Sequence, residues 1–459
     1  MSLTRELAAV LAAVTFTDLP AQVIADTHRS VLDWLGSTLA GAVEEPARLM
    51  QRVVAQIGKS DEATVFAFGR ASAPGAALAN GVASHILELD DVHKGSTLHA
   101  AAPIIPAALA VAEREHADGR SFLAAVTLGY EAAFRIGEAV NPSHYRFFHP
   151  TGTVATFGAA VAAASLLRLT SEQMLQALGN AGTQAAGLWE FNADGAMSKH
   201  LHAGKAALNG VMSADLARMG FTGATQILEG HRGFFRAMSA SYDPGRIREG
   251  LGERWKIGEN CYKLHSCCGH THSAIDSALA LRAEQQWSAD DVLANTAGIH
   301  IETYGPGYEI VKQLNPRSPF QAKFSISYCV VAGLLEGRVG LGQFSADRFA
   351  ATGVCCQPVR DLLRRTQVTV ADDLTRKYPA AWPARVTLTL RNGSRLQAAS
   401  DYPRGNPENP VATAELEDKF RNLVEPRFGA ATVSQALQAL RAVDSCSDMA
   451  NLFRDILPA

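Results

Sequence analysis

The sequence predicts a mainly α fold, in which both chain ends form one large all-helical domain and a smaller α+β domain is inserted between them. Apolar residues recur at helical spacing from Leu3 to about Met238, period-two alternation begins near residue 260, and helical spacing then returns. With 459 residues, 47% of them hydrophobic, the chain can bury more than one core. The predicted boundaries are 1–260 and 403–459 for the helical domain and 261–402 for the α+β domain.

Local signals in the first part support helices that pack closely. Alanine and glycine crowd the segment "TVATFGAAVAAASLLRL", and such small side chains let helices approach one another. Thr151 or Thr153 is expected to cap this helix. Thr170 and Gln173 have the spacing of a capping box, and Gly179 is expected to end the helix that they begin.

The inserted part combines strands and helices. The segments "GIHIETYG", "QVTVADD" and "ARVTLTLRNGSRLQAAS" alternate apolar and polar residues, and Asn392-Gly393 predicts a two-residue hairpin turn within the last of them. Helical patterns at "AKFSISYCVVAGLLEG" and "SADRFAATG" lie between these strands. We infer that the final segments "ATAELEDKFRNLV", "VSQALQALRAV" and "SDMANLFRDIL" are helices that rejoin the first bundle.

Composition excludes several classes of protein. Lys+Arg 42 against Asp+Glu 45 gives a net charge of −3, so no nucleic-acid partner is expected. No apolar run reaches the roughly 18 residues of a membrane span, and the N-terminus lacks the basic start of a signal peptide. We therefore expect a cytoplasmic protein. Seven cysteines lack the spacing of a disulfide framework, so we expect free thiols.

Polar and titratable groups concentrate in four loops. These are "LDDVHKGSTLH", "NPSHYRFFHPTGT", "DGAMSKHLHAGKAALNG" and "YKLHSCCGHTH". Ten of the 14 histidines lie in or beside them: His85, His93, His99, His144, His149, His200, His202, His265, His270 and His272. Histidine and lysine act as acids or bases near neutral pH, and their cations bind carboxylates, so this clustering indicates a site.

No metal or cofactor is expected from the motifs. The adjacent Cys267 and Cys268 cannot readily chelate one tetrahedral ion, and no second Cys/His pair stands at zinc-finger spacing. A Cys–His dyad in this segment is the alternative, although proximity in sequence does not establish the necessary hydrogen bond. Neither a GxGxxG nor a GxxxxGK[ST] phosphate loop is present.

The set of blocks "LELDDVHKGSTLH", "FHPTGTVATFG", "AMSKHLHAGKAALNG", "KLHSCCGHTHSAIDSAL" and "FQAKFSISYCVVAGLLEG" resembles the MmgE/PrpD family. That family includes 2-methylcitrate dehydratase, cis-aconitate decarboxylase and iminodisuccinate epimerase. The resemblance implies a helical domain with an inserted α+β lid domain, a homodimer, an active site in the cleft between them, and chemistry without metal or organic cofactor.

The resemblance also assigns roles to residues. It places the family's catalytic groups at His99, His149, Lys199 and, as in the decarboxylase branch, Tyr328. The candidate substrate-binding residues are Asp90, Asp91, His93, Thr97, Tyr145, Arg146, His202, Lys263 and His272. This chain departs from the family where H-P-S has become His99-Ala100-Ala101, where D-D-T has become Asp90-Asp91-Val92, and where His200 replaces a proline. The substrate is therefore not carried over.

These residues suggest a mechanism. Lys263, Arg146 and Lys199 would hold a small di- or tricarboxylate, and their charges would stabilise the enolate-like anion formed when a proton leaves the carbon next to a carboxylate. A histidine or lysine would take the proton, and Tyr328 or a second histidine would return one. We predict a lyase, a dehydratase first. An epimerase, a decarboxylase and a non-catalytic carboxylate-binding protein are the alternatives.

Overall fold

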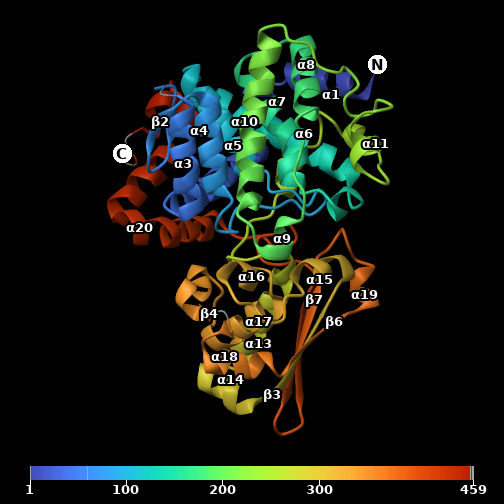
Figure 1. Ribbon diagram of the computed structural model, residues 1–459, viewed down its shortest axis with the longest axis vertical. Helices are drawn as coiled ribbons and strands as arrows, with labels where there is room; N and C mark the ends of the chain where they lie inside the picture. Colours follow the sequence, from blue (N-terminus) through green and yellow to red (C-terminus); the bar gives the residue numbers. More distant parts are fainter. Residues whose placement is uncertain (1, 59, 351, 455, 457–459) are drawn as a thin grey trace. The chain divides into compact units, whose positions relative to one another are not determined.

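The computed structural model describes residues 2–58, 60–350, 352–454 and 456. It is 59% helical and 10% strand, which confirms the predicted mainly α fold. The chain forms two compact units, one made of Met1–Ile86, Asp90–Asn260 and Ala412–Ala459, the other of Leu87–Leu89 and Cys261–Val411. Figure 1 shows both, coloured along the sequence.

The first unit is a helical bundle. Its longer helices are α1 (Leu3–Ala13), α2 (Ala21–Gly41), α3 (Glu45–Ile57), α4 (Ala73–Ser84), α5 (Ala101–Arg114), α6 (Gly119–Val140), α7 (Pro150–Leu166), α8 (Ser171–Gly182), α10 (Ser198–Arg218) and α20 (Thr413–Arg441). Short helices are α9 (Phe191–Asp194), α11 (Phe234–Met238) and α12 (Gly245–Arg248). Two short antiparallel strands, β1 (Ala63–Val65) and β2 (Gly69–Ala71), form a hairpin, so this unit is not entirely helical.

Small residues set the spacing of the central helices, as their composition predicts. A Cβ on Gly81 of α4 would lie 2.8 Å from the Cα of Gly204 in α10. A Cβ on Gly129 of α6 would lie 2.8 Å from the carbonyl oxygen of Gly158 in α7. Backbones can approach this closely only without side chains between them. The result brings the start of α7 and the start of α10 near the end of α4.

The two chain ends meet in this unit. Helix α20, red in Figure 1, packs against α2, and Lys419 Nζ lies 2.6 Å from the buried Asp33 Oδ1. Gly429, at φ 80°, kinks α20, so two of the predicted C-terminal helices are joined. In the third predicted segment the described residues form a 3-10 turn at Met449–Asn451, and Asp455 and Leu457 lie outside the described part of the chain.

Two helix-end predictions need correction. The capping box of Thr170 and Gln173 is present, but α8 continues past Gly179 to Gly182. Gly179 is required for close packing, because a Cβ there would lie 2.5 Å from the backbone nitrogen of Ala224. Neither Thr151 nor Thr153 caps α7, whose N-cap is His149.

The second unit packs helices against a sheet. The sheet has the strand order β6-β3-β7-β8, from β3 (Thr296–Thr303), β6 (Thr366–Val370), β7 (Ala384–Leu390) and β8 (Arg395–Ser400). Strands β3 and β6 are parallel and the other pairs antiparallel. The helices are α13 (His272–Glu284), α14 (Ala289–Asn295), α15 (Gly305–Val311), α16 (Pro319–Lys323), α17 (Ile326–Glu336), α18 (Gln357–Leu363) and α19 (Asp372–Thr375).

The core of this unit lies between the sheet and α13 and α17. Ile299, Ile301 and Leu388 from the strands are buried with Ile275 and Val330 from the helices. The hairpin at Asn392-Gly393 is present, but Leu390 pairs with Ser394, which leaves three residues in its loop rather than two. The predicted helix at "SADRFAATG" is instead a 3-10 turn, Ala346–Arg348, followed by the strand β4 (Phe349–Ala350), which pairs with β5 (Gly353–Val354).

The seven cysteines are free thiols, as predicted. Among the described residues, no helix has the length and apolar character needed to cross a membrane.

Candidate active site

The segment between α4 and α5 builds one wall of a histidine cluster in the helical unit. His85 follows the last residue of α4 and forms its C-cap. A tight turn, in which His93 pairs with Leu98 and Thr97 adopts φ 49°, then returns the chain to α5. Asp91 anchors the return, because its carboxylate accepts from the backbone N–H of Ala101 at 3.0 Å.

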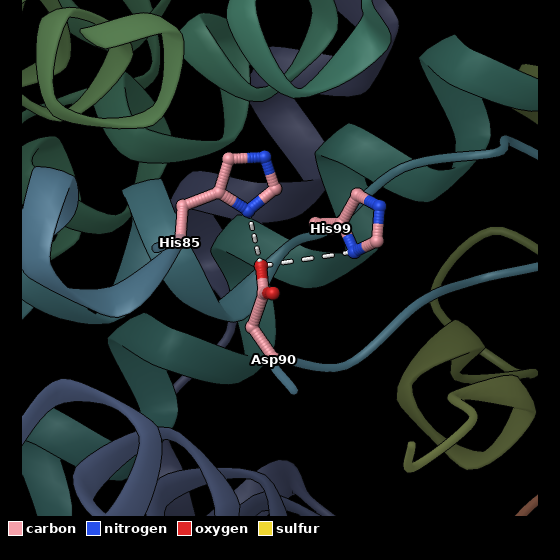
Figure 2. Close-up of side chains that lie close together, drawn as sticks. All are labelled: His85, Asp90 and His99. Carbon is pink, nitrogen blue, oxygen red and sulfur yellow. Dashed lines mark hydrogen bonds and ion pairs between the residues drawn. The ribbon is translucent and has the colours of Figure 1, made fainter. Parts of the chain in front are cut away.

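Asp90 lies between two imidazoles. Its Oδ2 accepts a hydrogen bond from His85 Nδ1 at 2.6 Å and lies 3.7 Å from His99 Nδ1 (Figure 2). His99 Nδ1 itself donates to the carbonyl oxygen of Asp91 at 2.6 Å. Asp90 and His85 are fully buried, whereas His99 is partly exposed. His99 is therefore the member of this group that a small molecule can reach.

A second imidazole pair adjoins the first. His149 precedes α7, His202 lies in the second turn of α10, and their Nδ1 atoms are 3.0 Å apart, a hydrogen bond in which one ring donates and the other accepts. The ring of His149 stacks on His85 with centroids 5.5 Å apart and lies 6.2 Å from His99. Helices α4, α7 and α10 thus bring distant histidines into one cluster.

The cluster holds His149 in its neutral form. Burial, followed by the neighbouring His202, His85, Lys199 and His99, keeps the pKa of His149 well below its usual 6.5. Burial, followed by His85, Lys205 and Lys199, lowers the pKa of His202 to about 4. A neutral imidazole can accept a proton at neutral pH. His149 Nε2 is buried and has no hydrogen-bond partner, so this atom can take that role when Nδ1 carries the ring proton and donates to His202.

Two further groups of α10 adjoin the imidazoles. Lys199 is buried in the first turn of α10, close enough for its charge to lower the pKa of His149. His200, which stands where the family has proline, is also buried, and its ring lies edge-on to His85 at 6.4 Å. Trp189 and Phe191 also contact His149, with ring centroids 5.0 and 5.7 Å away.

The geometry of His85, Asp90 and His99 is that of hydrogen bonds rather than metal ligation. The three side chains offer donor atoms within 4.8 Å of one another, as a metal site would. However, two ligands of one tetrahedral zinc ion lie about 3.3 Å apart, and His85 Nδ1 is only 2.6 Å from Asp90 Oδ2. A second set, His93, Glu138 and Glu259, already contains a cation, because Lys256 Nζ lies 2.9 Å from Glu138.

Other predicted binding residues of this unit lie in different surroundings. Both carboxylate oxygens of Asp91 are engaged by protein groups, and burial raises the pKa of this acid to about 7. The ring of His93 stacks on Phe134. Thr97 Oγ1 accepts from Asn141, Tyr145 packs on Trp189, and the exposed Arg146 lies over Phe147. Substrate contacts by these residues stay predictions.

Three predicted site residues belong to the second unit. Lys263 Nζ donates to the backbone carbonyl of Glu88 at 3.3 Å and lies 3.4 Å from its carboxylate, within that unit. His272 Nε2 donates to the carbonyl of Cys267 at 3.3 Å. The hydroxyl of Tyr328 donates to the carbonyl of Gln343, and burial raises the pKa of Tyr328. A hydroxyl so engaged is a weak candidate for proton transfer.

His85 is the residue that sequence reasoning passed over. It was counted among the clustered histidines but given no role, since nothing in the sequence shows that the loop after α4 folds its ring between Asp90 and His149. The available signal was its spacing of five residues from Asp90 across a helix end.

Comparisons with known proteins identify the family of this chain. The MmgE/PrpD N-terminal domain matches residues 5–246, and the MmgE/PrpD C-terminal domain matches residues 265–444. The chain is 27% identical to human cis-aconitate decarboxylase over 97% of this chain and 93% of that protein. It is 25% identical to cis-aconitate decarboxylase-like protein oryM of Aspergillus oryzae, over 95% and 93%. It is 24% identical to cis-aconitate decarboxylase of Aspergillus terreus, over 95% and 92%. On the strength of both domain matches, the chain belongs to the MmgE/PrpD family.

Proposed function

We propose that this protein is a lyase that acts on a small di- or tricarboxylate without a metal or organic cofactor. The observation that carries the proposal is the neutral His149, buried beside His99, Lys199 and His202. Neutral imidazole accepts protons, partly exposed imidazole can return them, and a lysine ammonium binds carboxylates and stabilises developing negative charge.

Decarboxylation of a cis-aconitate-like acid is the first candidate. The relatives that match this chain over nearly their whole length are named cis-aconitate decarboxylase or cis-aconitate decarboxylase-like protein. In this reaction a C–C bond to one carboxylate breaks, and its electron pair passes to the carbon next to the double bond. Lys199 would stabilise that charge, and His99 would deliver a proton to carbon. Carbon dioxide leaves, and solvent reprotonates the imidazole.

Dehydration of a 2-methylcitrate-like hydroxy acid is the second candidate, and the state of His149 favours it. The neutral Nε2 would take a proton from the carbon next to a carboxylate, and His99 would protonate the departing hydroxyl. Sequence reasoning placed this reaction first, and the named relatives now move decarboxylation ahead of it. We also propose that the protein forms a homodimer and lies in the cytoplasm. Light scattering tests the dimer.

The experiment is a substrate panel in deuterated water, followed by NMR and mass spectrometry. We expect one unsaturated or hydroxylated tricarboxylate to be consumed. Released carbon dioxide identifies a decarboxylase, and a new double bond with loss of water identifies a dehydratase. Deuterium in recovered substrate without net conversion identifies an epimerase instead. Binding of these acids with neither exchange nor conversion would refute the proposal that the protein is an enzyme.

A further inference from the structure

His85 contacts three residues of the candidate site, although no role has yet been assigned to it. Its Nδ1 donates to Asp90 at 2.6 Å, its ring stacks on His149 at an interplanar angle of 22°, and its centroid lies 5.0 Å from His99. Its Nε2 is buried and has no hydrogen-bond partner. Donation from Nδ1 fixes the tautomer and leaves Nε2 as a lone pair.

His85 lies inside the cluster, where it contacts Asp90, His149 and His99. Its side chain is 0% exposed, as is that of Asp90, whereas His99 and His202 are partly exposed. The exposed imidazoles can meet a small acid, and His85 lies behind them. The structural arrangement is that of a buried carboxylate and imidazole that orient reacting groups, as the buried aspartate orients the histidine of a serine protease.

Two contacts would be lost together without His85. Asp90 would lose the donor that holds its carboxylate 3.7 Å from His99 Nδ1. His149 would lose the flat ring that stacks on it. Both losses loosen imidazoles whose positions must be fixed for proton transfer.

We propose that His85 is a positioning residue, which sets the Asp90 carboxylate beside His99 through its Nδ1–H and sets the plane of His149 through its ring face. The proposal rests on the proposed function for its kinetic consequences. Its structural content, the orientation of two imidazoles, does not depend on which reaction the site performs.

Two variants separate the contacts. His85→Asn places an amide N–H near the position of Nδ1 and keeps the donor to Asp90, whereas His85→Phe keeps a flat ring and removes the donor. We expect His85→Phe to lower kcat by about tenfold to a hundredfold, the scale for partners that orient acting groups, with little change in KM. We expect His85→Asn to recover the part of kcat that depends on the position of Asp90 and to lose the part that depends on the ring face against His149.

His144→Gln is the matched control. His144 is a fully buried histidine of the same unit whose two nitrogens bond to Met238 and Thr153, outside the cluster. Its replacement should lower the melting temperature and leave kcat near the wild-type value. A merely structural His85 would behave in the same way as His144.

A readout without turnover keeps the two proposals distinguishable. In protein labelled with ¹⁵N-histidine, the ring signals of His99 should move in His85→Phe and those of His149 should move in His85→Asn, and both should stay near their wild-type positions in His144→Gln. If wild-type protein converts no acid, the proposed function fails while this comparison still decides the role of His85. Unmoved His99 signals in His85→Phe, or unmoved His149 signals in His85→Asn, would overturn the proposal.

Discussion

The two units each bury a cluster of histidines, and the clusters differ in what their nitrogens do. In the second unit, each ring bonds to a protein group: His265 to Asp276 at 2.9 Å, His270 to the Tyr304 hydroxyl and His272 to the Cys267 carbonyl. In the helical unit, the Nε2 atoms of His85 and His149 are buried and have no hydrogen-bond partner. Clustering alone therefore does not identify acid/base groups.

The unpartnered nitrogens of the first cluster also affect the stability of the protein. A buried polar atom left without a partner costs about 1–3 kcal/mol. The helical unit carries this cost at the Nε2 atoms of His85 and His149, whereas the bonded histidines of the second unit stabilise their surroundings. We expect the first cluster to govern turnover and the bonded ring of His270 to govern stability.

The largest expected effect is at His149. His149→Ala removes the proposed proton acceptor and should lower kcat by about a hundredfold or more, the range for a positioned acid or base. Steady-state kinetics on the substrate found in the panel measures this. The melting temperature of the variant serves as the control, since His149 also precedes α7. Wild-type turnover in a folded variant would contradict the comparison between the clusters.

The second largest expected effect is at Lys199. Lys199→Ala removes the buried ammonium of α10, and we expect turnover to fall by about a hundredfold, with a higher KM because the ammonium also holds a substrate carboxylate. Lys205→Ala is a matched control on the same helix, since Lys205 Nζ donates to the backbone carbonyls of Gly152, Gln184 and Ala186. Equal kcat and KM in the two variants would show that Lys199 is not part of the site.

A substitution in the second cluster should change the free energy of unfolding rather than turnover. His270→Phe deprives the buried Tyr304 hydroxyl of its imidazole partner, which should cost about 1–3 kcal/mol of unfolding free energy and leave kcat near the wild-type value. Urea denaturation and kinetics on the same preparation measure both quantities. A large loss of kcat with normal stability would show that the second cluster is also catalytic.

The same variant sharpens the comparison through pH. Burial, followed by Lys263 and His272, lowers the pKa of His270 to about 3 in the folded protein. Between pH 6.5 and pH 3 the imidazole of His270 is therefore protonated in the unfolded chain and neutral in the folded chain. The contribution of His270 to the free energy of unfolding is complete above about pH 6.5 and falls as the pH decreases toward 3. At pH 5 the loss approaches about 2 kcal/mol. His270→Phe should lose less stability than wild type between pH 7 and pH 5.

Local chemistry made much of the fold predictable. The capping box of Thr170 and Gln173 and the hairpin at Asn392-Gly393 are present because each depends on adjacent residues. Gly179 shows the limit of such signals. A glycine that ends a helix and one that admits another chain segment are alike in sequence, and only the approach of Ala224 distinguishes them.

The candidate site was predictable in part. The structure brings His99, His149 and His202 together beside Lys199, as the family motifs imply. His85 and His93 lie eight residues apart, yet one ring stacks on His149 and the other on Phe134. Which way each ring turns depends on the tight turn at Thr97 and on packing against α6 and α7, and sequence spacing contains neither.

The most direct test of the account is the titration of His149 in the wild-type protein. Imidazole ¹⁵N spectra, with the signal assigned through His149→Gln, report the protonation of this ring as pH changes. We predict that His149 is neutral at pH 6.5 and above, since burial and the neighbouring His202, His85, Lys199 and His99 hold its pKa well below 6.5. A midpoint at or above pH 6.5 would contradict the claim that the cluster keeps a neutral base ready.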